Sequence, residues 1–171
     1  MPDQLTQVEK EAVNKFPLAA GEFCRLIEGF ESYDRKQMFD KLPVYLADLC
    51  QVASQLPNVE PVTERTDFRQ EEITNHAREY ARLSEALRKR FGDLDTYWTV
   101  FDITEKEEPA RGSLASDITE IYLDLKDSLA LISNGTAMDD IYWEWRFDFR
   151  EHWSRHMAEA LRVILQQSDS A

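Results

Sequence analysis

Residues 143–156, WEWRFDFREHWSRH, contain three of the four tryptophans and two of the three histidines in the chain. The first seven residues alternate apolar and polar side chains, which is the period of a half-buried strand. The sequence that follows, REHWSRHMAEALRVILQQ, has helical spacing, and neither glycine nor proline separates the two parts. A lone strand with no partner elsewhere would also leave backbone groups unpaired. We therefore predict one continuous helix through the whole stretch.

On a helix that turns by about 100° per residue, the aromatic side chains of this stretch point in opposite directions. Trp143 and Phe147 fall on one side, and Trp145 and Phe149 fall on the other. A helix that carries apolar side chains on opposite faces is buried on most sides. We expect this last helix to span residues 136–166, to be the longest, and to be central in the fold.

Four further amphipathic patterns precede this helix. Together the five patterns predict an all-α fold, a single-domain bundle of about five main helices over residues 1–171. Capping residues, basic last turns and glycines mark the expected ends of the helices. The expected boundary residues are Thr6 with Glu9, Asp34, Gly92, and either Ser113 or Ser116.

The connections between helices follow from proline content and charge. Residues 55–66 contain two prolines and no hydrophobic period, and residues 104–112 are highly charged, so we predict a loop in each. We expect residues 93–103 to form one short helix. Pro17 lies inside a helical pattern and is expected to kink or break it, whereas Pro43 is expected to bend the second helix.

Composition and length favour a folded domain with one core. Of the 171 residues, 43% are hydrophobic, yet no apolar run approaches the ~18 residues of a membrane span. The polar, acidic start lacks the basic and apolar parts of a signal peptide, so we expect a cytoplasmic protein of bacterial type. Cys24 and Cys50 lie in apolar helical patterns and are expected to be free, buried thiols.

The formal net charge of −13 is concentrated in residues 93–144, where thirteen acidic side chains face three basic ones. A surface of this sign repels phosphate backbones. We therefore expect no nucleic-acid or membrane binding, and a protein partner, if there is one, should be basic.

Three segments in the second half of the chain carry a resemblance to a known family. They are YWTVFDI, SLASDITEIYLDLKDSLALISNG and WEWRFDFREHWSRHMAEALR. They resemble an uncharacterised bacterial family of compact all-helical domains of unknown function, over about residues 90–165. The matching positions are Tyr97 with Asp102, residues 117–126, and residues 143–156. Ser116 and Thr119 stand where acidic residues are expected, which reduces the number of carboxylates in any cluster on that helix. Ser154 stands where a glycine is expected. The resemblance implies the fold and the compartment, and no activity.

His152 and His156 are four residues apart, so their imidazoles share one side of a helix. Such a pair binds Zn, Ni or Fe when further ligands arrive from elsewhere. The fourth helix offers three carboxylates as candidate ligands, namely Asp117, Glu120 and Asp124. The structural alternative makes His156 a buried imidazole with one polar partner, places His152 nearer the polar edge, and gives His76 a buried role as well. No HExxH motif is present.

Arg146 and Arg150 fall between tryptophans in an otherwise apolar arc of the last helix. A buried guanidinium requires a partner, because its desolvation is costly when unpaired. We predict ion pairs with Asp117 and Asp124 that fix the register between helices. The alternative is a pocket for a small carboxylate or phosphate, lined by Arg146, Arg150, Trp143 and Tyr122.

These observations favour a soluble helical domain that binds a protein or a small ligand and is not an enzyme. No cofactor is predicted in this interpretation. The first alternative is a metal-binding protein or metal-dependent enzyme that uses His152, His156 and carboxylates of the fourth helix. The second is a small-anion binder that uses Arg146 and Arg150. No nucleophile elbow or glycine-rich phosphate loop occurs in the sequence.

Overall fold

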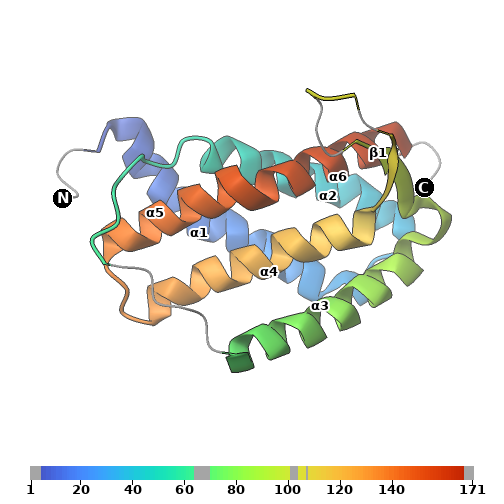
Figure 1. Cartoon of the computed structure of the whole chain (residues 1–171), viewed down its shortest axis with the longest axis horizontal. Helices are drawn as coiled ribbons and strands as arrows, with labels where there is room; N and C mark the ends of the chain where they lie inside the picture. The colour runs from blue at the N-terminus through green and yellow to red at the C-terminus, as the bar shows by residue number, and fades with distance from the viewer. Residues whose placement is uncertain (1–4, 64–69, 101–103, 107, 168–171) are drawn as a thin grey trace.

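The computed structural model describes residues 5–63, 70–100, 104–106 and 108–167. It confirms the predicted all-α bundle (Figure 1). The main helices are α1 (Gln7–Glu28), α2 (Arg35–Ala53), α3 (Gln70–Phe91), α4 (Leu114–Ser133), α5 (Met138–Asp148) and α6 (Ser154–Gln167). Short 3₁₀ turns follow α1 (Phe30–Ser32) and α3 (Gly92–Leu94). None of the helices in the described part of the chain is long and apolar enough to cross a membrane.

Helix α4 runs through the middle of the bundle, between α3 on one side and α5 with α6 on the other (Figure 1). It also packs on α1, which in turn pairs with α2. The core is rich in aromatic side chains. The rings of Phe16 and Trp145 lie 4.7 Å apart and those of Phe16 and Trp153 6.5 Å apart. The Trp145 indole N–H donates to the carbonyl of Ser128 at 3.0 Å, which joins α5 to α4.

The predicted starts of the first, second and fourth helices are confirmed. Thr6 and Asp34 each form a complete capping box, and the Ser113 hydroxyl accepts from the backbone N–H of Ser116. Such caps satisfy backbone donors that have no partner inside the helix. Pro17 lies inside α1 and does not break it, and Pro43 lies inside α2.

The last helical segment is long, as predicted, but it is not a uniform α-helix. A π-helical turn over Phe149–Trp153 joins α5 to α6. A π turn has i→i+5 hydrogen bonds, so it changes the direction of every side chain that follows it. Trp145 is buried as expected, whereas Phe147 is 39% exposed and stacks on Trp143 at 4.9 Å. The prediction that the Trp143 side of this helix belongs to the core was therefore wrong.

A short hairpin replaces the helix predicted over residues 93–103. Strand β1 (Thr96–Thr99) pairs antiparallel with β2 (Ala110–Ser113), whose residues were predicted to be loop. Tyr97 faces Gly112 across the pair, and the Tyr97 ring occupies the space that a side chain at this glycine would need. Residues 101–103, with Asp102, and residues 64–66 of the first predicted loop lie outside the described residues.

The hairpin is attached to the start of α4 by Asp95, which is 2% exposed. Its carboxylate accepts from the Ala115 backbone N–H at 2.8 Å and from the Ser113 hydroxyl. Its carbonyl accepts from the Leu114 backbone N–H. These contacts fix β1 beside the first turn of α4, and the candidate site lies along this helix.

Candidate functional site

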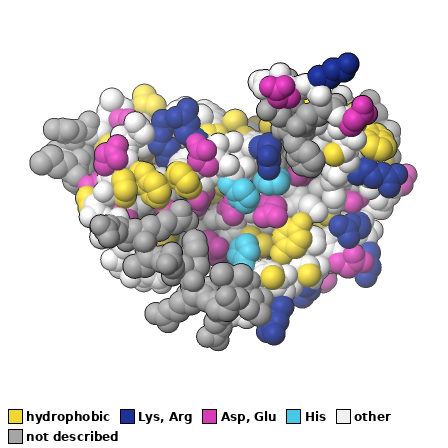
Figure 2. All heavy atoms as spheres, in the orientation of Figure 1, with side chains coloured by type: hydrophobic (Ala, Val, Ile, Leu, Met, Phe, Trp, Pro, Cys, Tyr) yellow, Lys and Arg dark blue, Asp and Glu magenta, His cyan; other side chains and the backbone are white. Residues whose placement is uncertain are grey.

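Helix α4 presents four carboxylates along one side, at positions 117, 120, 124 and 127. The helix buries Ile118, Ile121 and Leu125 in the core, and the spacing of the acidic residues gives them a shared side. Figure 2 shows the histidine side chains on one face of the molecule with acidic side chains between them. Each of the three histidines of the chain contacts a different aspartate of α4.

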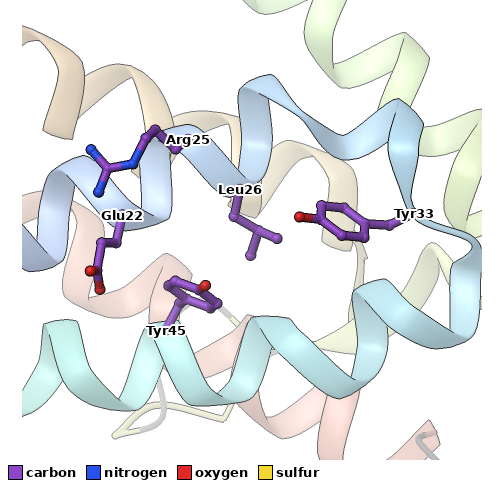
Figure 3. A pocket seen from close by; sticks show the side chains of 5 residues that line it. All are labelled: Glu22, Arg25, Leu26, Tyr33 and Tyr45. Carbon is purple, nitrogen blue, oxygen red and sulfur yellow. The ribbon is translucent and has the colours of Figure 1, made fainter.

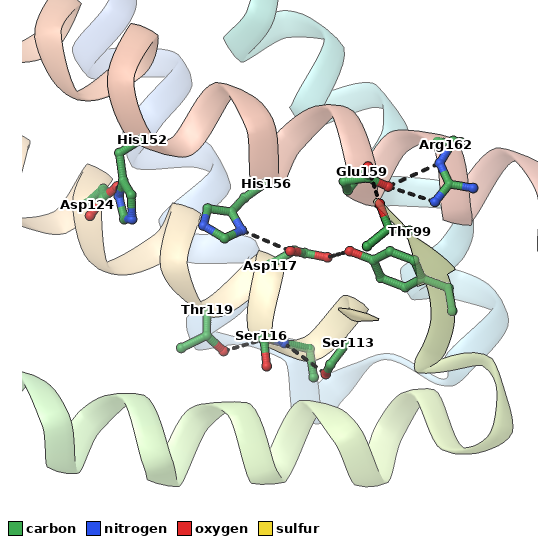
Figure 4. Close-up of polar contacts among 12 residues, drawn as sticks. Thr99, Ser113, Ser116, Asp117, Thr119, Asp124, His152, His156, Glu159 and Arg162 are labelled. Carbon is green, nitrogen blue, oxygen red and sulfur yellow. Dashed lines mark hydrogen bonds and ion pairs between the residues drawn. The ribbon is translucent and has the colours of Figure 1, made fainter. Parts of the chain in front are cut away.

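The most buried of these pairs joins three elements of the fold. Asp117 is buried in the first turn of α4, and one of its oxygens lies 2.9 Å from Nδ1 of His156 on α6. The other oxygen accepts from the Tyr97 hydroxyl of β1 at 2.5 Å (Figure 4). The pKa of Tyr97 is raised, first by burial and then by its hydrogen bond to the Asp117 carboxylate and the charge of that group. The phenol therefore stays protonated and continues to donate.

The second pair, His152 with Asp124, is more exposed to solvent than the first. Nδ1 of His152, in the π turn, is 2.5 Å from a carboxylate oxygen of Asp124. Burial raises the pKa of Asp124, although the hydrogen bond and charge of His152 act in the opposite direction. The imidazole of His152 is 46% exposed and that of His156 is 19% exposed. His152 thus lies nearer the polar edge, as predicted, whereas His156 has a polar partner but is only half-buried.

The two imidazoles lie beside each other, with ring centroids 5.3 Å apart and planes at 80°. We call this pair the histidine face. Figure 4 shows the ring of His156 with one nitrogen directed at Asp117 and the other turned toward His152. A neutral imidazole donates from only one nitrogen. Because both Nδ1 atoms face carboxylates, both rings are expected to carry their proton on Nδ1 and to present Nε2 as an acceptor.

The third histidine lies apart from this pair. Nε2 of His76 on α3 is 3.5 Å from Asp127; the side chain of His76 is half-buried and that of Asp127 is exposed. The predicted buried role of His76 is wrong. Its helix turns the imidazole toward the acidic side of α4 and not into the core.

The arginines of the last helix do not pair with the carboxylates of α4, so that prediction was wrong. Arg146 donates to the backbone carbonyl of Leu56 at 2.6 Å, and Arg150 is exposed. The predicted partners, Asp117 and Asp124, are bonded to histidines instead. For Arg150 the physical reason is the π turn, which contains this residue and also His152, the residue that contacts Asp124 instead.

The residues proposed to line an anion pocket make other contacts. Trp143 stacks on Phe147 along α5. Tyr122, on α4, hydrogen-bonds Glu28 of α1. Neither contact involves Arg146 or Arg150, so the anion pocket stays a prediction.

In the described part of the chain, no group of three or more His, Cys, Asp or Glu side chains is arranged to hold a metal ion. The carboxylates of Asp117 and Asp124 are directed at imidazole nitrogens. Glu120 is half-buried between them and contributes negative charge near Asp124. The metal-ligand set predicted from the sequence is thus reduced to His152 and His156 as available ligands.

Two hollows elsewhere on the described surface do not include these residues. One, of about 260 Å³, lies between α1 and α2 (Figure 3). It is lined by Glu22, Arg25, Leu26, Tyr33 and Tyr45. Another, of about 380 Å³, has Glu9, Glu60 and Asp139 in its lining and is therefore strongly acidic. The first is small for a ligand pocket, and the charge of the second is unfavourable for an anion.

A further polar group beside the histidine face was not identified from the sequence. Glu159 accepts from the Thr99 hydroxyl at 2.8 Å and from Arg162 at 2.7 Å, and the guanidinium of Arg162 lies over the Tyr97 ring. His156, Glu159 and Arg162 are three residues apart in succession, so they share one side of α6. This spacing is the sequence signal from which the group could have been identified. These contacts fix the hairpin, and hence Tyr97, against α6.

The fold and site define a compact all-helical protein with two carboxylate-anchored imidazoles on its surface. The chain belongs to the family described as Domain of unknown function (DUF5063), whose model matches residues 7–168. This confirms the resemblance and extends it into the first half of the chain. A crystal structure of a Bacteroides fragilis protein, solved as a structural-genomics target, is similar: its TM-score is 0.72 and its sequence identity 25%, over 94% of each chain. No curated protein matches the chain.

Proposed function

We propose that this chain is a small-ligand-binding domain and that its ligand binds at the histidine face. One observation carries the proposal: His152 and His156 lie side by side at the surface while α4 engages Nδ1 of each. Structural histidines commonly need one polar partner, which these have. Among the described residues, each ring meets this need through Nδ1, and the proposal assigns Nε2 of each ring to the ligand.

The supports of the two rings also favour a binding role. Asp117 is held on its far side by Tyr97, whose ring in turn lies under Arg162. Rings fixed in this way lose less side-chain entropy when a ligand binds, which increases affinity. A binding site is effective when its contacting groups are held by a second layer of packing and hydrogen bonds.

The test is a set of titrations followed by imidazole ¹H–¹⁵N spectra of uniformly labelled protein. The probes are a divalent transition-metal chloride, inorganic phosphate, a short dicarboxylate and a lysine-rich peptide. Saturable shifts at His152 and His156 with any of the first three, and none at His76, support the proposal. His76 is the internal control, since it also contacts an aspartate of α4 but lies apart from the other two.

Two results would overturn the proposal. The first is that none of the probes shifts the histidine signals. The second is that the peptide alone binds and shifts signals along the acidic side of α4 without preference for His152 and His156. That result would favour an interaction domain for a basic protein.

A further inference from the structure

Building on this binding role, we infer that the ligand is a divalent transition-metal ion held by Nε2 of His152 and Nε2 of His156. The geometry of the pair points to it. An imidazole bound at about 2.0 Å has its ring centroid about 3.2 Å from the ion, so two rings at a tetrahedral angle have centroids about 5.2 Å apart. The observed separation is 5.3 Å. The rings are therefore already at the spacing that one shared ion requires.

Asp117 and Asp124 of α4 contact the histidines in the way that carboxylates contact histidines in metal sites. A histidine that binds a metal through one nitrogen almost always donates its other N–H to a carboxylate, a carbonyl or water. Here both Nδ1 atoms face aspartates, at 2.9 Å for Asp117 and 2.5 Å for Asp124. The carboxylates fix each ring and favour the proton on Nδ1. Asp117 and Asp124 are thus positioning residues and not ligands.

A site with two protein ligands leaves coordination positions open. The side chain of His152 is 46% exposed, so water or a small molecule can reach an ion bound there. Imidazole nitrogen suits Zn, Ni and Cu, whereas Mg²⁺ and Ca²⁺ prefer oxygen. The negative charge along α4, which includes Glu120 and Asp127 as well as the two anchoring aspartates, favours any cation. Selection therefore rests on the two nitrogens.

The experiment is calorimetric titration of the untagged full chain with NiCl₂ and with MgCl₂ near neutral pH. We expect one Ni²⁺ per chain and no Mg²⁺ binding. His152→Ala and His156→Ala should each weaken Ni²⁺ binding at least tenfold. The matched control His76→Ala should leave it unchanged. Asp124→Asn, which keeps the shape of the side chain but changes its hydrogen bonding, should weaken binding by about 10- to 100-fold.

A second measurement uses the unmodified chain and so does not depend on whether the variants fold. Substoichiometric Cu²⁺ broadens nearby NMR signals, and we expect it to broaden those of His152 and His156 before that of His76. The inference is overturned if Ni²⁺ does not bind up to ~1 mM, or if His76→Ala weakens binding as much as His152→Ala. If metal fails but phosphate or a dicarboxylate shifts His152 and His156, the metal assignment falls while the proposed binding face stands. If no probe shifts them, both fall.

Discussion

Replacing Asp117 by alanine should destabilise the protein more than any other single change at the acidic side of α4. The carboxylate is buried and bonds to Nδ1 of His156 at 2.9 Å and to the Tyr97 hydroxyl at 2.5 Å. Its loss leaves two largely buried donors unpaired, and each costs about 1–3 kcal/mol. The free energy of unfolding should fall by about 3 kcal/mol, which lowers Tm by about 6–12 °C for a chain of this size.

Urea denaturation followed by circular dichroism measures this loss, with the midpoint and the m-value fitted together. Asp117→Asn retains one acceptor and should cost roughly half as much. Asp127→Ala is the control, because its contact with His76 is exposed and worth less than about 1 kcal/mol. If Asp117→Ala unfolds within about 1 kcal/mol of the unmodified chain, Asp117 does not hold His156 and Tyr97 as described.

Three further changes test the packing. Trp145→Ala should lower the free energy of unfolding by about 3–5 kcal/mol, because the indole is buried and hydrogen-bonded. Trp143→Ala should lower it clearly less. The urea midpoints of the two variants measure this, and equal losses would contradict the burial of Trp145 in preference to Trp143. Burial raises the pKa of the Cys24 thiol to about 12, so only about one thiol in ten thousand is ionised at pH 8 in the native state. Cys24 should therefore resist iodoacetamide in the native protein and react after unfolding. Rapid alkylation of the native protein at Cys24, located by mass spectrometry, would refute this. Gly112→Ala should lower Tm, because the new methyl group enters the space of the tyrosine ring on the opposite strand; an unchanged melting curve would mean that the hairpin adjusts freely.

The helices and their starts could be predicted because their signals are local. Thr6 with Glu9, and Asp34, mark helix starts within four residues of sequence, and both form the expected caps. The burial of Trp145 followed from periodicity before the π turn. Local signals of this kind depend little on the rest of the chain, which explains why they were sufficient for the fold class.

The hairpin and the π turn could not be predicted because each depends on distant contacts. Strand β1 is only four residues long and is stabilised by β2 and by Asp95 at the start of α4. The π turn changes the helical phase, so an angle counted at about 100° per residue does not describe the direction of Arg150, which lies within the turn. The prediction paired Arg146 and Arg150 with Asp117 and Asp124. In the structure these two aspartates contact histidines instead. The i, i+4 spacing of His152 and His156 is local, so the sequence could indicate that their rings lie side by side, as they do in the structure.

The tautomers of His152 and His156 test the central claim most directly. The claim is that α4 holds Nδ1 of each ring and leaves Nε2 available for a ligand. Long-range ¹H–¹⁵N spectra at alkaline pH, where the imidazoles are neutral, distinguish the two nitrogens of each ring. We predict that Nδ1 carries the proton in both His152 and His156. A proton on Nε2 in either ring would show that its aspartate does not accept from Nδ1, and would contradict the account.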